Sequence, residues 1–213
     1  AIALAPNDRY LWLERETFAR KAQSKVSSIL KRLQRAPQEV LADNRVAQLH
    51  ARLLVEAGRF DKAIAVLGSR TFHVAEGETS TRPTWMWAHI GKGRLLAEQG
   101  DWQSALTYFQ KALEYPHHLG VGRPAHAGDA VPLFWIGLAL YRLGDRETAH
   151  GYWEECAQRP AHSPQDRAHQ VTALRLLGRE EEANRLLEAT GVRQGVEELQ
   201  AYLHETSKTG GDA

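Results

Sequence analysis

The small and apolar residues of this chain follow one pattern four times, each time around a glycine: Gly58, Gly100, Gly144 and Gly178. Leucine stands four residues before each glycine, and alanine stands five residues after it. A large apolar residue follows each alanine after four more positions, as Leu67, Phe109, Trp153 and Leu187. Apolar residues at this spacing on both sides of a glycine predict two helices joined by a tight turn.

Each part of the pattern has a physical reason. Glycine ends the first helix because it adopts a left-handed conformation without a Cβ clash. Aspartate follows two of the glycines, where its carboxylate can accept from the free N–H groups that begin the second helix. Small residues seven positions before three of the glycines, Ala51, Gly93 and Gly137, allow the two helices to approach closely. Proline ends two of the second helices because it cannot continue a helix.

Extended along the whole chain, this pattern predicts an all-α protein. We expect helices over 8–22, 24–35, 44–57, 60–68, 83–99, 101–114, 130–143, 145–158, 164–177, 179–189 and 193–205. The last of these carries Val196, Leu199 and Leu203 on one face and is predicted to cap the stack. A helix pair cannot bury its apolar face alone, so the pairs are expected to stack into a solenoid.

The small, aromatic and proline positions resemble the consensus of the tetratricopeptide repeat (TPR). The last two glycines have the TPR period of about 34 residues, and the earlier steps are longer. We therefore expect one TPR-like domain over residues 1–206, with about five antiparallel helix pairs, a divergent first pair and a disordered tail over 207–213. The extra residues fall in two insertions, over 69–82 and 115–128, which follow successive second helices and should lie side by side.

The insertions carry a second, narrower resemblance. The segments Ser69-Arg-x-Phe-His-x-x-Glu-Gly77 and Leu119-Gly-Val-Gly-Arg-Pro124 are similar to the C-terminal TPR region of a family of large bacterial proteins. Those proteins carry an N-terminal, mutarotase-like domain of unknown function. The chain departs from that family at residues 74–75, where Val-Ala replaces the expected Pro-Trp. The resemblance implies a bacterial parent protein with a carbohydrate link, for which this region would be an accessory.

Net charge, apolar runs and cysteine content limit the classes of partner and the compartment that we expect for this protein. The formal net charge is +1, whereas phosphate neutralisation needs a basic stripe, so we expect no nucleic-acid partner. No apolar run approaches the ~18 residues of a membrane helix, so we expect no membrane partner. The lone cysteine, Cys156, fits a reducing compartment and is predicted to pack in the core, and we expect a cytoplasmic protein. The chain starts without Met, and residues 1–6 match the end of a second helix, so we expect it to be part of a longer protein.

The first helices of the pairs line the concave side of a TPR stack. Counting back from the glycines predicts a partner-binding groove lined by Arg45, Gln48, Arg52, Trp87, Arg94, Phe134, Tyr141, Arg142 and Arg175. Arginines with interleaved aromatic rings suit an acidic peptide, a carboxylate or another protein surface. The alternative is that these side chains contact another domain of the same polypeptide or solvent only.

The insertions supply further candidates: Arg70, Phe72, His73, Glu76, Tyr115, Gly120, Gly122 and Arg123. The Gly120–Arg123 string lacks the Lys-Ser/Thr of a P-loop, so we expect it to shape a packed loop in which Arg123 pairs with a carboxylate. His117, His118 and His126 with His73 or Glu76 match no zinc spacing, so we expect no metal and no cofactor. Acid–base catalysis needs a pair of carboxylates in a pocket, whereas Glu76 and Glu78 lie on a flexible-looking loop, so we expect no catalytic residue.

Together these features favour a non-catalytic TPR scaffold that docks a protein, or another domain of its own polypeptide, through the groove and the two insertions. The alternative is an accessory region of a carbohydrate-active enzyme whose catalytic domain lies upstream.

Overall fold

A computed structural model describes residues 2–73 and 81–208, with side chains up to residue 206. All regular structure in these residues is helical, which confirms the all-α, helical-repeat fold class. The chain divides into two compact units. Unit 1 contains residues 1–91 and 115–122, and unit 2 contains residues 92–114 and 123–213. The single domain expected over residues 1–206 stays a prediction, and each unit is described by itself.

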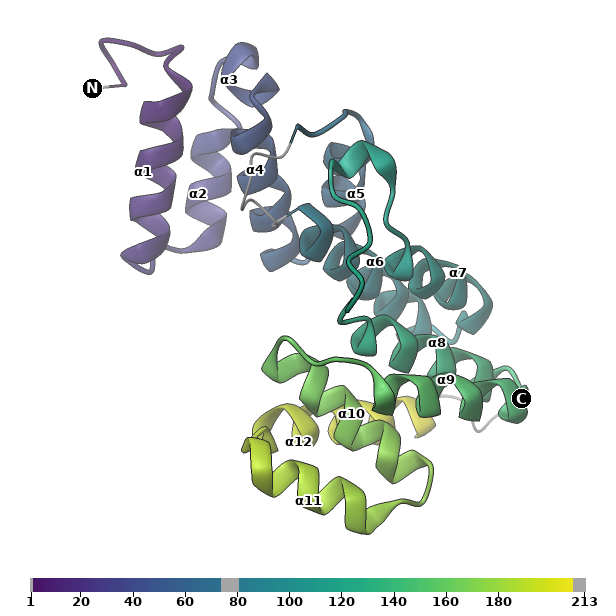
Figure 1. Cartoon of the computed structure of the whole chain (residues 1–213). Helices are drawn as coiled ribbons and strands as arrows, with labels where there is room; N and C mark the ends of the chain where they lie inside the picture. The colour runs from purple at the N-terminus through teal and green to yellow at the C-terminus, as the bar shows by residue number, and fades with distance from the viewer. Residues whose placement is uncertain (1, 74–80, 209–213) are drawn as a thin grey trace. The chain divides into compact units, whose positions relative to one another are not determined.

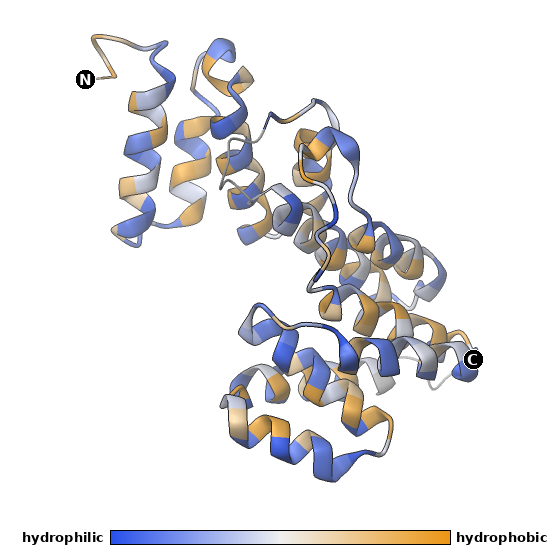
Figure 2. Ribbon diagram, viewed as in Figure 1, coloured by the Kyte–Doolittle hydropathy of each residue, from blue (hydrophilic) through white to orange (hydrophobic). Residues whose placement is uncertain are grey.

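Unit 1 contains α1 (Arg9–Lys21), α2 (Val26–Leu33), α3 (Gln38–Ala42), α4 (Asn44–Glu56), α5 (Phe60–Gly68), the first part of α6 (Thr81–Glu98) and the short 3₁₀ helix η1 (His117–Leu119). Helices α1, α2 and α4 lie side by side (Figure 1). Hydrophilic and hydrophobic residues alternate along α1 and α2 (Figure 2), because one face of each helix is buried. The core between these helices contains Trp12, Ile29, Leu33 and Leu53.

Unit 2 contains the rest of α6, then α7 (Trp102–Leu113), α8 (Ala130–Arg142), α9 (Arg146–Gln158), α10 (Pro164–Leu176), α11 (Glu180–Thr190) and α12 (Arg193–Lys208). Helix α10 packs against α8, α9, α11 and α12. Helix α8 is the centre of this unit, because every residue from 130 to 139 is buried. Such a helix is apolar on all sides, as expected for one surrounded by others.

The predicted turns are confirmed. The four glycines at positions 58, 100, 144 and 178 have left-handed φ angles of +68°, +83°, +93° and +76°. The Asp101 and Asp145 carboxylates accept from the backbone N–H groups of Ser104 and Thr148 at 3.0 and 3.1 Å. The predicted caps therefore begin α7 and α9.

The small residues of the first helices also act as predicted. A Cβ built on Gly93 would lie 2.4 Å from the Phe109 ring, and one built on Gly137 would lie 2.6 Å from Trp153 Nε1. Real Cβ atoms do not approach other atoms so closely. The large residue of each second helix therefore packs directly on the backbone of the first.

Three local expectations are corrected. Helix α3 was not predicted, because its five residues are too few to show a helical period. The 3₁₀ helix η1 lies within the second insertion, where a loop was expected. Helix α12 extends to residue 208 and so takes in two residues of the predicted tail, whereas residues 209–213 lie outside the described part of the chain.

Candidate functional site

The predicted groove residues fall in both units. In unit 1, Arg45, Gln48 and Arg52 follow one another at helical spacing on α4, so they share one face of that helix. Arg45 and Arg52 are exposed, and Gln48 is half-buried. The Arg52 Nε lies 3.4 Å from a Glu56 carboxylate oxygen, an exposed pair of little strength. Trp87, on α6, is half-buried. Unit 1 thus presents two guanidinium groups on one helix face.

In unit 2, the Arg94 side chain lies against two aromatic rings. Its guanidinium carbon is 5.2 Å from the centroid of the Trp135 ring and 4.6 Å from that of the Tyr202 ring. The Tyr202 hydroxyl donates to the Arg94 carbonyl oxygen at 3.3 Å, and burial raises the Tyr202 pKa to about 12. The two rings stabilise the cation through their negative faces.

The Arg142 side chain also contacts α12. Its Nη2 donates to the Leu203 carbonyl oxygen at 3.3 Å and lies 3.5 Å from the Thr206 hydroxyl. The guanidinium carbon lies 5.5 Å from the centroid of the Trp102 ring. Arg94 and Arg142 are both half-buried, and the groove predicted in this unit is therefore covered in part by the last helix of the chain.

The other predicted groove residues of unit 2 do not lie with these two. Phe134 is corrected: it is fully buried, because α8 is surrounded on all sides, so a partner cannot contact its ring. Tyr141 is exposed and packs its ring on Trp153 of α9 at 5.5 Å. Arg175 points to α11, where its Nε lies 3.8 Å from a Glu180 carboxylate oxygen. Consecutive positions on a helix diverge by about 100°, which separates Tyr141 from Arg142.

Sequence reasoning missed the aromatic residues that hold Arg94. The Trp135 and Tyr202 rings meet edge to face at 5.1 Å, and Trp135 Nε1 donates to His169 Nε2 at 3.1 Å. Tyr202 stands three residues after Leu199, so helical spacing alone would have placed both on one face of α12. No pattern in the sequence indicates that this face covers α6 and α8.

The two insertions contact each other, which confirms that they lie side by side. The backbone N–H of Phe72 donates to the His118 carbonyl oxygen at 2.7 Å. The Thr81 hydroxyl donates to the Leu119 carbonyl oxygen at 3.1 Å. The side chains of Phe72 and Leu119 are buried in one cluster with Trp85. Phe72 is therefore a core residue of unit 1.

The predicted arginines of the insertions, Arg70 and Arg123, have partners within the chain. Arg70 Nη1 donates to the carbonyl oxygens of Leu41 and Ala42, at 3.2 and 3.1 Å, and so holds the end of α3. Arg123 pairs with the buried Asp129 carboxylate at 2.8 Å, which confirms the predicted ion pair. The Arg82 guanidinium carbon lies 4.1 Å from the centroid of the half-buried Tyr115 ring.

Gly120, Gly122 and His73 complete the insertion residues that the structure describes. Gly120 is left-handed, with φ +72°, and ends η1, whereas a Cβ on Gly122 would meet no atom within 4 Å. His73 is exposed. Glu76 and Glu78, and the departure at residues 74–75, lie outside the described residues.

The described residues include the histidines and the cysteine that were considered as metal ligands or as a nucleophile. No group of three His, Cys, Asp or Glu side chains there could hold a metal ion. His118 stacks edge to face on Trp85, and the His126 carbonyl oxygen accepts from His162 Nε2 at 2.7 Å. Cys156 is fully buried, and burial raises the pKa of its thiol, which confirms a core residue.

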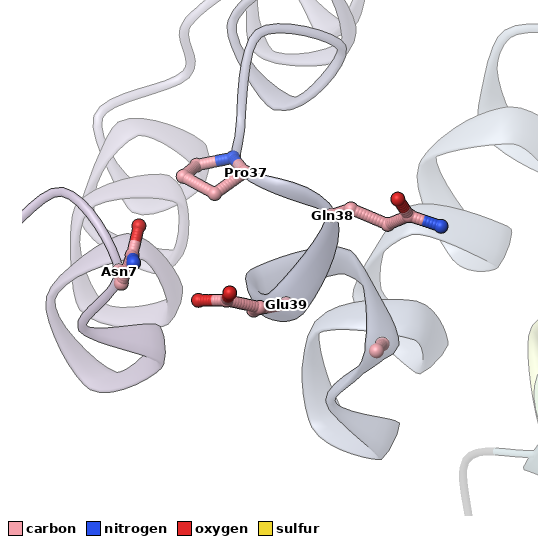
Figure 3. Close-up of a pocket in the computed structure, with 5 residues that line it drawn as sticks. Asn7, Pro37, Gln38 and Glu39 are labelled. Carbon is pink, nitrogen blue, oxygen red and sulfur yellow. The ribbon is translucent and has the colours of Figure 1, made fainter.

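Unit 1 also has a shallow depression of about 300 Å³, lined by Asn7, Pro37, Gln38, Glu39 and Ala42. The Glu39 carboxylate points toward Asn7, and Gln38 points the other way (Figure 3). One carboxylate on an open surface does not make a binding site.

Comparison with known proteins supports the repeat and goes no further. The tetratricopeptide repeat family matches residues 87–115, which contain the end of α6 and all of α7. No curated protein and no solved structure matches the chain. Within the described residues, no helix is both long and apolar enough to span a membrane. A TPR-type repeat in an all-helical fold indicates a protein-interaction scaffold.

Proposed function

We propose that this chain is a non-catalytic docking module that binds an acidic segment of another protein, or of another domain of its own polypeptide. The observation that supports the proposal is the pair of exposed arginines on one face of α4, Arg45 and Arg52. The sequence pattern predicts these positions as part of a partner-binding groove.

The chemistry of that face favours a carboxylate partner. A guanidinium group can bind a carboxylate through two parallel N–H···O bonds, which gives both strength and geometry. Arg45 and Arg52 stand two helical turns apart on α4, so they can engage two acidic residues of one segment. Gln48 lies between them and supplies a neutral amide that can donate and accept.

The alternative of a carbohydrate-enzyme accessory depends on the insertions. Their described arginines and aromatic rings make contacts within the chain: Arg70 and Phe72 lie against other parts of unit 1. Arg123 pairs with Asp129 of unit 2. This supports a structural role for these loops, and we therefore propose the docking function alone.

Affinity capture from native lysate tests the proposal. Immobilised wild-type chain is compared with a variant carrying Arg45→Gln and Arg52→Gln, and captured proteins are quantified by mass spectrometry. The matched control is Arg35→Gln, which removes another exposed arginine of unit 1. We expect the double variant to lose at least one protein that the wild type and the control both retain, and to lose it at least tenfold. Identical capture by all three chains would refute binding through α4.

A further inference from the structure

Helix α12 packs across the first helices of the pairs in unit 2. Gly195 of α12 lies against Ala168 of α10, since a Cβ on this glycine would be 3.0 Å from the Ala168 Cβ. Tyr202 contacts Trp135 of α8 and Arg94 of α6. Thus α12 crosses α10, α8 and α6, the three first helices of the pairs in this unit.

Helix α12 has the pattern of a groove-binding helix. Its buried side chains are Val196, Leu199, Tyr202 and Thr206, which are spaced three or four residues apart. The intervening positions are mostly exposed and include Glu197, Glu198, His204 and Glu205. An amphipathic helix that places one apolar face in a groove is a recurrent mode of protein recognition.

Within the described part of the chain, helix α12 leaves hydrogen-bond donors of Arg94 and Arg142 without acceptors. The Nε atoms of Arg94 and Arg142 are buried and have no hydrogen-bond partner among the described residues. Near Arg142, α12 offers a carbonyl oxygen and a hydroxyl group, but its buried face carries no carboxylate. Buried N–H groups of a cation without an acceptor are unfavourable, and a carboxylate would satisfy them better.

A short link attaches α12 to the rest of unit 2. Helix α11 ends at Thr190 and α12 begins at Arg193, so two residues join them. The first, Gly191, is left-handed with φ +65°, a conformation that glycine adopts without strain. A change at this one link can move α12 without any change in the pairing of α10 with α11.

We propose that α12 is a displaceable occupant of unit 2, and that the partner that replaces it is an amphipathic helix of the same pattern with a carboxylate facing Arg142. This inference rests on the proposed docking function and adds a second docking surface, on unit 2, whose ligand is an acidic helix. The tether gives α12 a high effective concentration, so a competing helix must bind more tightly than α12 or arrive when α12 has opened.

Binding of peptides to the full-length chain tests this inference. The probe is a fluorescein-labelled peptide with the sequence of residues 193–208, measured by fluorescence anisotropy against the wild-type chain and against the Tyr202→Ala chain. The substitution weakens the chain's own helix, so we expect the variant to bind the peptide at least tenfold more tightly than the wild type. A peptide carrying Thr206→Asp should bind severalfold more tightly than one carrying Thr206→Asn, and the difference should shrink in high salt.

Equal binding by a folded Tyr202→Ala chain and the wild type would overturn the displacement, and equal binding of the Asp and Asn peptides would overturn the carboxylate. If Tyr202→Ala fails to fold, hydrogen exchange of the wild-type chain decides the displacement. We expect the amides of residues 196–206 to exchange through local opening, faster than those of α8 and α10. Exchange only with global unfolding would overturn it. These results would refute the inference about α12. The proposed function would still stand if the capture experiment showed a protein that depends on Arg45 and Arg52.

Discussion

Acidification is expected to destabilise unit 2 through His169. This imidazole, on α10, is buried against the Phe134 and Trp135 rings of α8, and its Nδ1 donates to the Gln165 carbonyl oxygen at 2.7 Å. Its Nε2 faces the indole N–H of Trp135 at 3.1 Å. Because an indole nitrogen can only donate, Nε2 must be unprotonated in the folded state. A second proton on the ring would remove this hydrogen bond.

The magnitude follows from the pKa. Burial, with a smaller effect of the Arg94 charge, lowers the His169 pKa from 6.5 to about 4. A folded-state pKa below the unfolded value means that the unfolded chain binds the proton more readily. The stability that neutral His169 contributes is therefore complete above pH 6.5 and is lost as the pH falls toward 4. The loss is about 2 kcal/mol at pH 5 and about 3 kcal/mol at pH 4.

Urea denaturation at pH 7 and pH 5, with His169→Gln as the control that cannot titrate, measures this loss. We expect the free energy of unfolding of the wild type to fall by about 2 kcal/mol more than that of the variant over this interval. NMR titration of the His169 ring should give the same low pKa. A ring that titrates near pH 6.5, or an equal pH dependence in both chains, would show that the imidazole is not held neutral by its surroundings.

Three substitutions, followed by denaturant unfolding, test the helix packing, a helix cap and a buried ion pair. Gly137→Ala should lower the free energy of unfolding by about 1–3 kcal/mol, because the new methyl group overlaps Trp153. Its matched control, Gly151→Ala, meets no atom within 4 Å on an exposed helix face and should raise stability by about 0.5–1 kcal/mol; two losses of equal size would contradict the packing. Asp145→Ala removes the cap of α9 and should lower the free energy of unfolding by about 1 kcal/mol. Glu16→Gln removes the fully buried carboxylate that accepts from Arg32 Nη2 at 2.7 Å, and it should lower the free energy of unfolding by about 3 kcal/mol. An unchanged denaturation midpoint would show that this ion pair does not stabilise unit 1.

The repeat could be predicted from the sequence because its signals are local. A glycine that must take a positive φ, as Gly144 does, marks a turn whatever surrounds it. The close approach of Gly137 to Trp153 follows from two residue sizes at a fixed spacing. The pairing of Arg123 with a carboxylate could also be predicted, because a charged side chain in a packed loop needs a partner.

The groove was harder to predict because it depends on what packs on each helix from elsewhere in the chain. Phe134 was assigned to the surface by counting, but α8 has no exposed face over residues 130–139. The apolar face of α12 was visible in the sequence, with Leu203 in place of Tyr202 as its third buried residue. The surface that α12 covers could not be predicted from the sequence, because helical periodicity shows that a helix packs on a partner without showing which one.

Site-specific photo-crosslinking tests the central claim most directly, namely that the ligand-facing side of the repeats docks an acidic segment. A photoreactive residue is placed at Gln48, on the α4 face between the two exposed arginines, or at Lys62, an exposed position on α5. We expect a protein adduct from position 48, with an acidic segment at the crosslinked site, and none from position 62. Adducts from position 62 alone, or equally from both, would contradict it.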